Sequence, residues 1–123
     1  RILEHRAEKG CSFRQAEIDL GDVAGHQRAG QLMLLNSDMG QAAVRAVGHH
    51  HELPDPDDLL RLLHVADNLA KSVGLGTLAG EEAEFDADAL RELGLSNGRI
   101  EELCEDLQKE MVQEIKSVVA TCL

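Results

Sequence analysis

Histidines and acidic residues that could bind a metal ion are concentrated in the middle of this chain. Imidazole nitrogen and carboxylate oxygen are ligands of zinc, manganese, iron and similar ions. Asp67 is the most indicative of these residues, because it stands in a strongly apolar stretch and an unpaired buried carboxylate is costly. The spacing matches no standard zinc pattern such as H-E-x-x-H. The candidate ligands are His26, the run His49-His50-His51, Glu52 and Asp67.

Each candidate also has a structural interpretation. His26 could cap a helix or line a helix contact, and the three consecutive histidines could be solvated at the negative end of a helix dipole. Asp67 could bond a backbone amide, or Lys71 four residues on. His64 is expected to pack rather than to bind metal. Spacing alone leaves both interpretations open.

Helices are expected to position these residues, because no segment shows the alternation typical of strands. Only 2% of the residues are aromatic, so the core must be aliphatic, which favours packed helices. The sequence therefore predicts one all-α domain, residues 1–123, a bundle of about six helices. The segments expected to be helical are 1–9 (the end of a helix), 12–20, 23–35, 38–51, 56–73, 87–93 and 97–122.

The predicted boundaries rest on capping residues and breakers. Gly10, Gly74 and Gly94 are expected to end helices, and Leu75–Phe85 is expected to be a surface loop. The helix after Pro56 has so broad an apolar face that we expect it to be central. The expected helix starts are Ser12 with Gln15, Ser37 or Asp38, Asp55 with Pro56 in the first position, Asp86 and Ser96.

Composition excludes several functions. The 12 basic and 23 acidic residues give a net charge of −11, which disfavours nucleic-acid binding. No apolar run approaches the roughly 20 residues that span a bilayer, and no signal peptide opens the chain. Cys11, Cys104 and Cys122 lack C-x-x-C spacing, which suits a reducing cytoplasm. Because the chain starts at Arg1 within a helical pattern, we expect it to be the carboxy-terminal part of a longer protein, with an open apolar patch if helices precede it.

An ordered set of motifs resembles the HD superfamily, and within it the HDOD domain. The resemblance extends over nearly the whole chain, and the order of the motifs is more specific than any one of them. The set includes Ala7-Glu8-Lys9-Gly10 and the stretch Ser12 to Glu17. It continues with His26-Gln-Arg-Ala-Gly30, Ala46-Val-Gly-His-His50-His51-Glu52, Leu63-His-Val-Ala-Asp67-Asn-Leu-Ala70, Gly74-Leu-Gly76 and Ala89-Leu-Arg-Glu-Leu93.

The resemblance implies a helical bundle with a metal site. HD phosphohydrolases hold one or two metals through an upstream His, a His-Asp doublet, further histidines and a distal Asp. In this chain His26, His50, His51 and Asp67 match the later ligands. The doublet has no match here, and the Gly-Tyr-Pro signature of the cyclic-dinucleotide branch is replaced by Leu53–Pro56. The implied site is therefore incomplete, and we identify no catalytic residue.

These features lead to one functional hypothesis and one alternative. The first is a non-enzymatic bacterial signal-transduction module that acts through protein–protein interaction. Its expected partners are fused or separate signalling domains of the receiver type, or a second copy in a homodimer, but neither nucleic acid nor membrane. The alternative is the carboxy-terminal part of an HD-type metal-dependent phosphohydrolase or phosphodiesterase. In either case the remaining ligands could hold a divalent ion (Mn, Fe, Zn, Mg or Ni).

Overall fold

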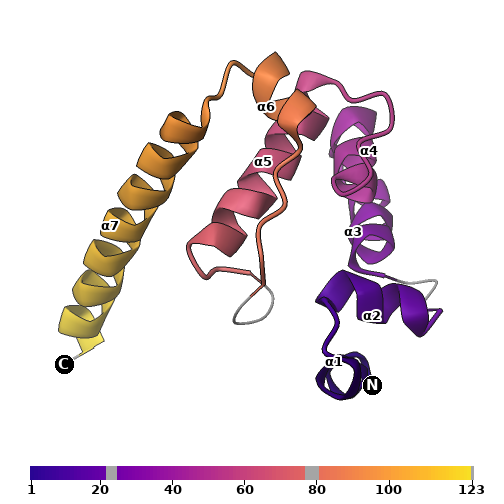
Figure 1. Ribbon diagram of the computed structural model, residues 1–123, viewed down its shortest axis with the longest axis horizontal. Coiled ribbons are helices and arrows are strands. Elements are labelled where there is room, and N and C mark those ends of the chain that lie inside the picture. Colours follow the sequence, from indigo (N-terminus) through magenta and orange to yellow (C-terminus); the bar gives the residue numbers. More distant parts are fainter. Residues whose placement is uncertain (22–24, 77–80, 123) are drawn as a thin grey trace.

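The computed structural model describes residues 1–21, 25–76 and 81–122. These residues form seven helices and no strand, which confirms the predicted all-α class (Figure 1). The first segment, expected as the end of a helix, is a helix of eight residues. The helices are α1 (Ile2–Lys9), α2 (Phe13–Asp19), α3 (His26–Leu35), α4 (Gln41–His49), α5 (Asp58–Ser72), α6 (Ala87–Glu92) and α7 (Asn97–Cys122).

Helix α5 is central, as its broad apolar face predicts. It packs against α4, α6 and α7, and α4 packs in turn against α3. Helix α1 packs only against α2 among the described helices. In Figure 1 the α1–α2 unit (residues 2–19) lies below α3, whereas α7 extends away on the other side of α5. Helices α3, α4 and α5 thus form the frame to which the other helices are attached.

The core is aliphatic, as the composition requires. Val65 of α5, Leu90 of α6 and Ile100 of α7 form one buried cluster, in which each side chain is at most 8% exposed. Burial of a side chain of this size contributes roughly 1.5–3 kcal/mol, so this cluster fixes α6 and the start of α7 on α5. The partly buried residues packed against it are Leu69, Phe85, Leu93, Leu95 and Cys104.

Several predicted helix boundaries are confirmed by the capping contacts. The Ser12 side chain accepts the amide hydrogen of Gln15 at 3.1 Å and begins α2. Asp86 accepts the amide hydrogen of Ala89 at 2.7 Å and begins α6. Gly10 ends α1 with a φ of 63°, a left-handed conformation that glycine adopts without steric cost.

The start of α5 differs from the prediction. Asp55 was expected to cap this helix with Pro56 in its first turn, but Asp57 is the capping residue. The reason is a tertiary contact of Arg45, a residue of α4. Its guanidinium donates to the carbonyl oxygen of Asp55 at 2.5 Å and to the carboxylate of Asp57 at 3.1 Å. Asp55 has a φ of 45° and lies outside the helix.

The start of α4 also differs from the prediction. Ser37 or Asp38 was expected to cap it, whereas the structure places Gly40 at this position. The Ser37 hydroxyl donates instead to the carbonyl oxygen of Leu34 at 2.7 Å. The Ser37 hydroxyl therefore satisfies a carbonyl oxygen at the end of α3 and does not cap the start of α4. A hydroxyl can do either, because it both donates and accepts hydrogen bonds.

Helix α3 was expected from Val23 and begins at His26; residues 22–24 lie outside the described part of the chain. Its small residues allow the expected close approach of a neighbouring helix. A Cβ atom placed on Gly30 would lie 2.7 Å from Cγ1 of Val47 in α4. This contact is shorter than carbon atoms tolerate, so glycine is required where α3 and α4 meet.

The expected loop 75–85 is confirmed where it is described. Residues 81–86 form an extended segment that leads into α6, and residues 77–80 lie outside the described part. The segment runs beside α5 in Figure 1. No described helix, α7 included, combines the length and the apolar character that crossing a bilayer requires.

Candidate metal centre

Three of the four predicted metal ligands come from two helix ends. His26 is the first residue of α3, and His50 is the residue that caps the carboxyl end of α4, followed by His51. Because α3 and α4 pack against each other, these ends meet. The close packing of α3 on α4 at Gly30 therefore helps to set the distance of His26 from His50 and His51.

The three imidazoles face one another. One ring nitrogen from each of His26, His50 and His51 lies within 4.8 Å of the other two. The Nε2 atoms of His26 and His51 are 2.9 Å apart. Two imidazoles bound to one zinc ion, each at about 2.0–2.1 Å, have nitrogens separated by roughly 3 Å. The geometry of these donors therefore fits a divalent metal ion.

A buried carboxylate orients His26. Glu17 of α2 is 8% exposed, and its two oxygens accept the backbone amide hydrogen and the Nδ1 hydrogen of His26, both at 2.8 Å. Since a carboxylate only accepts, Nδ1 of His26 carries a proton, and Nε2 is the nitrogen that faces His51. Such a carboxylate partner is usual for histidines that bind metals. Glu17 belonged to the sequence motif, but its orienting role was not predicted.

The imidazoles of His50 and His51 are held uncharged. His50 Nδ1 donates to the carbonyl oxygen of Val47 at 2.9 Å, so its Nε2 carries the lone pair. Burial lowers the pKa of His50. Burial, together with the nearby His50 ring and the charge of Lys71, lowers the pKa of His51 to about 3. Neutral imidazole is the form that binds metal, so no proton has to be displaced at neutral pH.

Asp67 lies beside the cluster but outside it. Its Oδ2 accepts from Lys71 Nζ at 2.6 Å, the pairing that the spacing allowed, and lies 3.9 Å from His51 Nδ1. The group of mutually close donors contains the three histidines without this carboxylate. Asp67 therefore lies near His51 beyond hydrogen-bond distance, and its charge is compensated by Lys71.

The remaining candidates have other contacts. His64 packs, as expected: it is 5% exposed, Nδ1 donates to the carbonyl oxygen of His50 at 2.8 Å, and Nε2 accepts from the Asp86 amide at 3.0 Å. Burial raises the pKa of Glu52, but hydrogen bonds from Gln27 and Arg14 outweigh it and the net shift is downward. Glu52 and His49 line a separate surface hollow.

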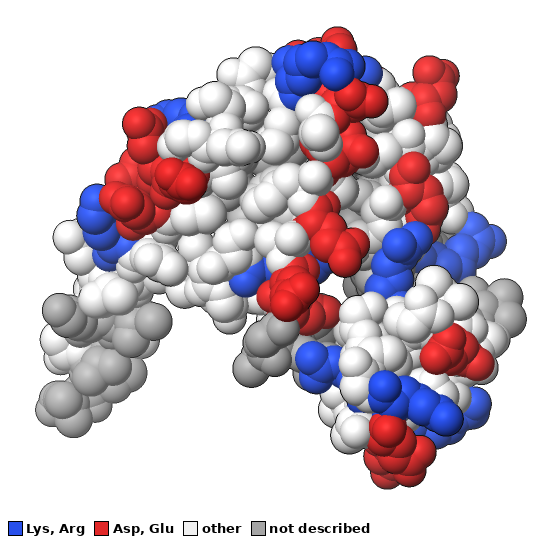
Figure 2. Space-filling view, viewed as in Figure 1, with Lys and Arg blue, Asp and Glu red and all other residues white. Residues whose placement is uncertain are grey.

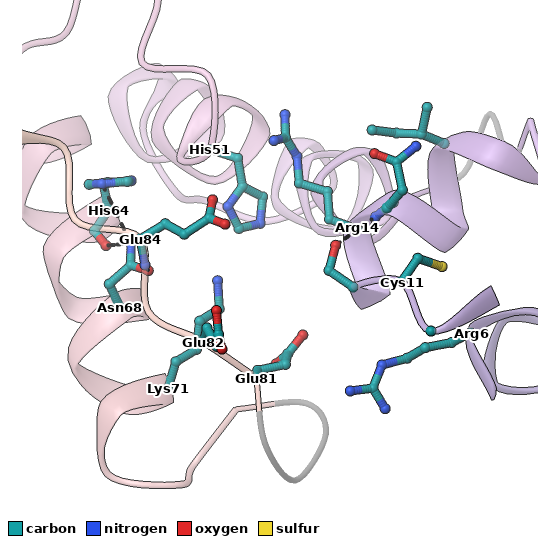
Figure 3. Close-up of a pocket in the computed structure, with 14 residues that line it drawn as sticks. Arg6, Cys11, Arg14, His51, His64, Asn68, Lys71, Glu81, Glu82 and Glu84 are labelled. Carbon is teal, nitrogen blue, oxygen red and sulfur yellow. Dashed lines mark hydrogen bonds between the residues drawn. The ribbon is translucent and has the colours of Figure 1, made fainter.

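A cavity of about 550 Å³ opens beside His51. Figure 3 shows α5 and the 81–84 segment on one side of it and the α1–α2 unit on the other. Basic and acidic groups both line the cavity, and the sequence did not predict that they would meet. Among the described residues, Arg6 Nε and Glu81 Oε2 are buried without a hydrogen-bond partner. Its charged lining residues are Arg6, Arg14, Lys71, Glu81, Glu82 and Glu84.

Asn68 builds one wall of this cavity, a role that sequence reasoning missed. It is 2% exposed, donates to the carbonyl oxygen of His64 at 2.9 Å and accepts from the amide of Glu84 at 2.8 Å. The side-chain amide of Asn68 thus fixes the extended segment 81–86 on α5. A polar side chain in an apolar helix was the signal available, the same signal that drew attention to Asp67.

Comparison of the chain with protein-family models, with curated proteins and with solved structures found no match. The geometry of the cluster and its surroundings is therefore what distinguishes one function from another. It consists of three clustered imidazoles, an orienting Glu17, an Asp67 paired with Lys71, and a cavity with charges of both signs.

Proposed function

We propose that this chain is a non-enzymatic signalling module of the HDOD type, which works in the bacterial cytoplasm through protein–protein interaction. One observation carries the proposal. The three histidines converge, but Asp67, the distal carboxylate ligand that the resemblance implies, is engaged by Lys71. A hydrolytic centre needs a full ligand set with an open position for water. The described donors support binding of an ion more directly than turnover.

The metal has a structural role in this proposal. When bound, the ion would act as a Lewis acid on its ligands and on bound water. His26, His50 and His51 would hold it, and they join the amino end of α3 to the carboxyl end of α4. An ion that binds only the folded chain adds to its stability, so the centre would fix the helices that present the interaction surface.

An exposed apolar patch supports a protein partner. It lies on the second half of α3 and the turn that follows, and four large apolar side chains there are 43% to 75% exposed. We call these residues the α3 patch: Leu32, Met33, Leu35 and Met39. Clustered exposed apolar residues mark interaction sites, and flexible methionines suit variable partners. Charges of both signs are interspersed over the face in Figure 2, which fits a protein better than a polyanion.

The proposal is tested by measuring metal content and turnover on the same samples. Wild type, His26→Ala and Asp67→Asn are loaded with Mn²⁺, Fe²⁺ or Zn²⁺ and analysed for bound metal. Each is then assayed with a phosphomonoester and a cyclic dinucleotide. We expect metal in wild type and in Asp67→Asn, none at this centre in His26→Ala, and turnover in no sample. Hydrolysis that requires both His26 and Asp67 would contradict the proposal.

The second candidate function is an HD-type phosphohydrolase, of which this chain supplies the carboxy-terminal part. The cavity favours it, because Arg6, Arg14 and Lys71 line the space next to His51. Cationic side chains beside a metal centre suit a phosphate group. Hydrolysis of the phosphomonoester or the cyclic dinucleotide that requires both His26 and Asp67 would select this candidate.

A further inference from the structure

A second group of metal-binding side chains lies in the α1–α2 unit, away from the three histidines. His5 of α1, Cys11 of the connecting turn and Asp19 of α2 each offer one donor atom, and these atoms lie within 4.8 Å of one another. His5 Nε2 is 3.1 Å from Asp19 Oδ2. A sulfur, a nitrogen and an oxygen donor thus meet where two helices cross.

The backbone between the two helices brings these side chains together. Gly10, in its left-handed conformation, ends α1 and turns the chain. Cys11 is the next residue and lies close to α1. Asp19 is the last residue of α2, and its Oδ1 accepts from Gln15 Nε2 at 2.6 Å. This bond holds the carboxylate, and Oδ2 faces His5.

Helix α1 has little else to hold it in place. It has eight residues, none of them buried, and packs only against α2 among the described helices. Isolated helices shorter than about 12–15 residues are marginal in water, so a contact beyond the helix is needed. The contact of His5 with Asp19 provides one such contact, although exposed pairs of this kind contribute little to stability.

We propose that His5, Cys11 and Asp19 form a second metal site, which takes zinc and clips α1 to α2. Thiolate, imidazole and carboxylate are the side-chain ligands of zinc, and three protein ligands leave a fourth position for water. Binding forms a zinc–sulfur bond as the Cys11 thiol releases its proton to solvent. Cys11 is also one of the residues that line the cavity in Figure 3.

The alternative is a His5–Asp19 ion pair beside a free thiol. A thiolate ligand distinguishes the two, because thiolate bound to Co²⁺ gives an intense near-ultraviolet charge-transfer absorption that imidazole and carboxylate do not. The experiment titrates Co²⁺ into the reduced, metal-free full chain and then adds Zn²⁺. We expect the charge-transfer band in wild type, its bleaching by zinc, and its loss in Cys11→Ser.

Two further variants separate this site from the histidine cluster and from other thiols. Cys104→Ala removes a half-buried cysteine elsewhere in the molecule and should keep the band. His26→Ala, which disables the other centre, should keep it too. A band absent from wild type, retained in Cys11→Ser or lost in His26→Ala would overturn the proposal. A failure of the function proposed above would leave the band unchanged.

Variants that keep the thiol guard against misfolding of Cys11→Ser. His5→Gln and Asp19→Asn should weaken cobalt binding at this site by about 10–100-fold or more. Loss of a residue that only supports a metal ligand already has an effect of this size. Helix content by circular dichroism verifies that each variant is folded. Unchanged cobalt affinity in both folded variants would also overturn the proposal.

Discussion

The neutral state of His50 and His51 follows from the surroundings of each residue. His51 has a side chain that is 10% exposed and lies beside His50 and Lys71, so a proton on its ring would lack water and meet positive charge. Asp67 opposes this effect only in part. The folded chain therefore excludes a proton that the unfolded chain accepts.

This exclusion predicts how stability depends on pH. The pKa of His51 is about 3 in the folded chain, below its ordinary value of 6.5. Below pH 6.5 the unfolded state takes up the proton and the folded state does not, so stability is present above that pH and is lost as pH falls toward 3. One proton corresponds to at most about 1.4 kcal/mol per pH unit. Urea unfolding of the metal-free chain at pH 7, 6 and 5 measures this slope.

The control is His51→Gln, whose amide stays neutral throughout this range. Carboxylates with lowered pKa values, such as Glu52, also reduce stability on acidification and contribute equally to both chains. The variant should therefore show a shallower slope than wild type. Parallel slopes would show that His51 does not exclude the proton.

Residue type made the histidines candidate ligands, and the resemblance to the HD superfamily selected His26, His50 and His51 together with Asp67. The structure brings the three histidines together, but their supporting contacts were not predicted. Glu17 and Asn68 act through partners 9 and 16 residues away along the chain, which no local pattern records. The outcome for Asp67 depended on the choice between Lys71 and the cluster, and spacing permits both.

At the scale of helices, α3 and α4 approach each other closely at Gly30, as the small residues of α3 led us to expect. A methyl group on Gly30 would meet Cγ1 of Val47, a stiff β-branched side chain with little room to move. Overpacking costs about 1–3 kcal/mol, whereas alanine gains about 1 kcal/mol of helix propensity over glycine. Gly30→Ala should therefore lose about 1 kcal/mol of stability, measured by thermal or urea unfolding.

Gly98→Ala is the matched control, because it places the same methyl group near the start of α7. The nearest atom there, Oγ of Ser96, is 4.0 Å away. This variant should be as stable as wild type or more so. Equal effects of the two substitutions would mean that helix propensity, not the α3–α4 contact, decides the outcome.

Helix boundaries show where local sequence stops being sufficient. Ser12, Asp86 and Ser96 begin helices as predicted, because each caps the amides that directly follow it. Asp55 does not, since Arg45 of another helix binds its carbonyl oxygen. The prediction thus failed at Asp55 through a distant side chain, and at Ser37 because its hydroxyl donates to the end of the preceding helix.

At the scale of the whole molecule, the α3 patch and the metal centre lie at different ends of α3. His26 begins this helix, while the exposed Met33 and Leu35 lie in its second half. A partner could therefore cover the patch without covering the histidines. The patch is the surface on which the proposed interaction function depends.

Charged substitutions in the α3 patch should impair association without unfolding the chain. Met33 is 75% exposed, so Met33→Glu changes the surface and leaves the core intact. We expect at least a 10-fold loss in affinity for a second copy or for a receiver-type domain, about 1.4 kcal/mol. Sedimentation velocity and titration calorimetry measure it. Val112→Glu, at a site on α7 that is 50% exposed, is the control and should have no effect.

Glu17 has a consequence for the molecule as a whole. Its carboxylate belongs to α2, yet it satisfies the first amide of α3 and orients the imidazole of His26. Separation of α2 from α3 would remove a helix cap and a ligand's partner in one step. Metal affinity and docking of the α1–α2 unit are therefore thermodynamically coupled, and the coupling free energy is the same in both directions. An event that pulls on α1 would weaken metal binding, and a bound metal would resist that pull to the same extent.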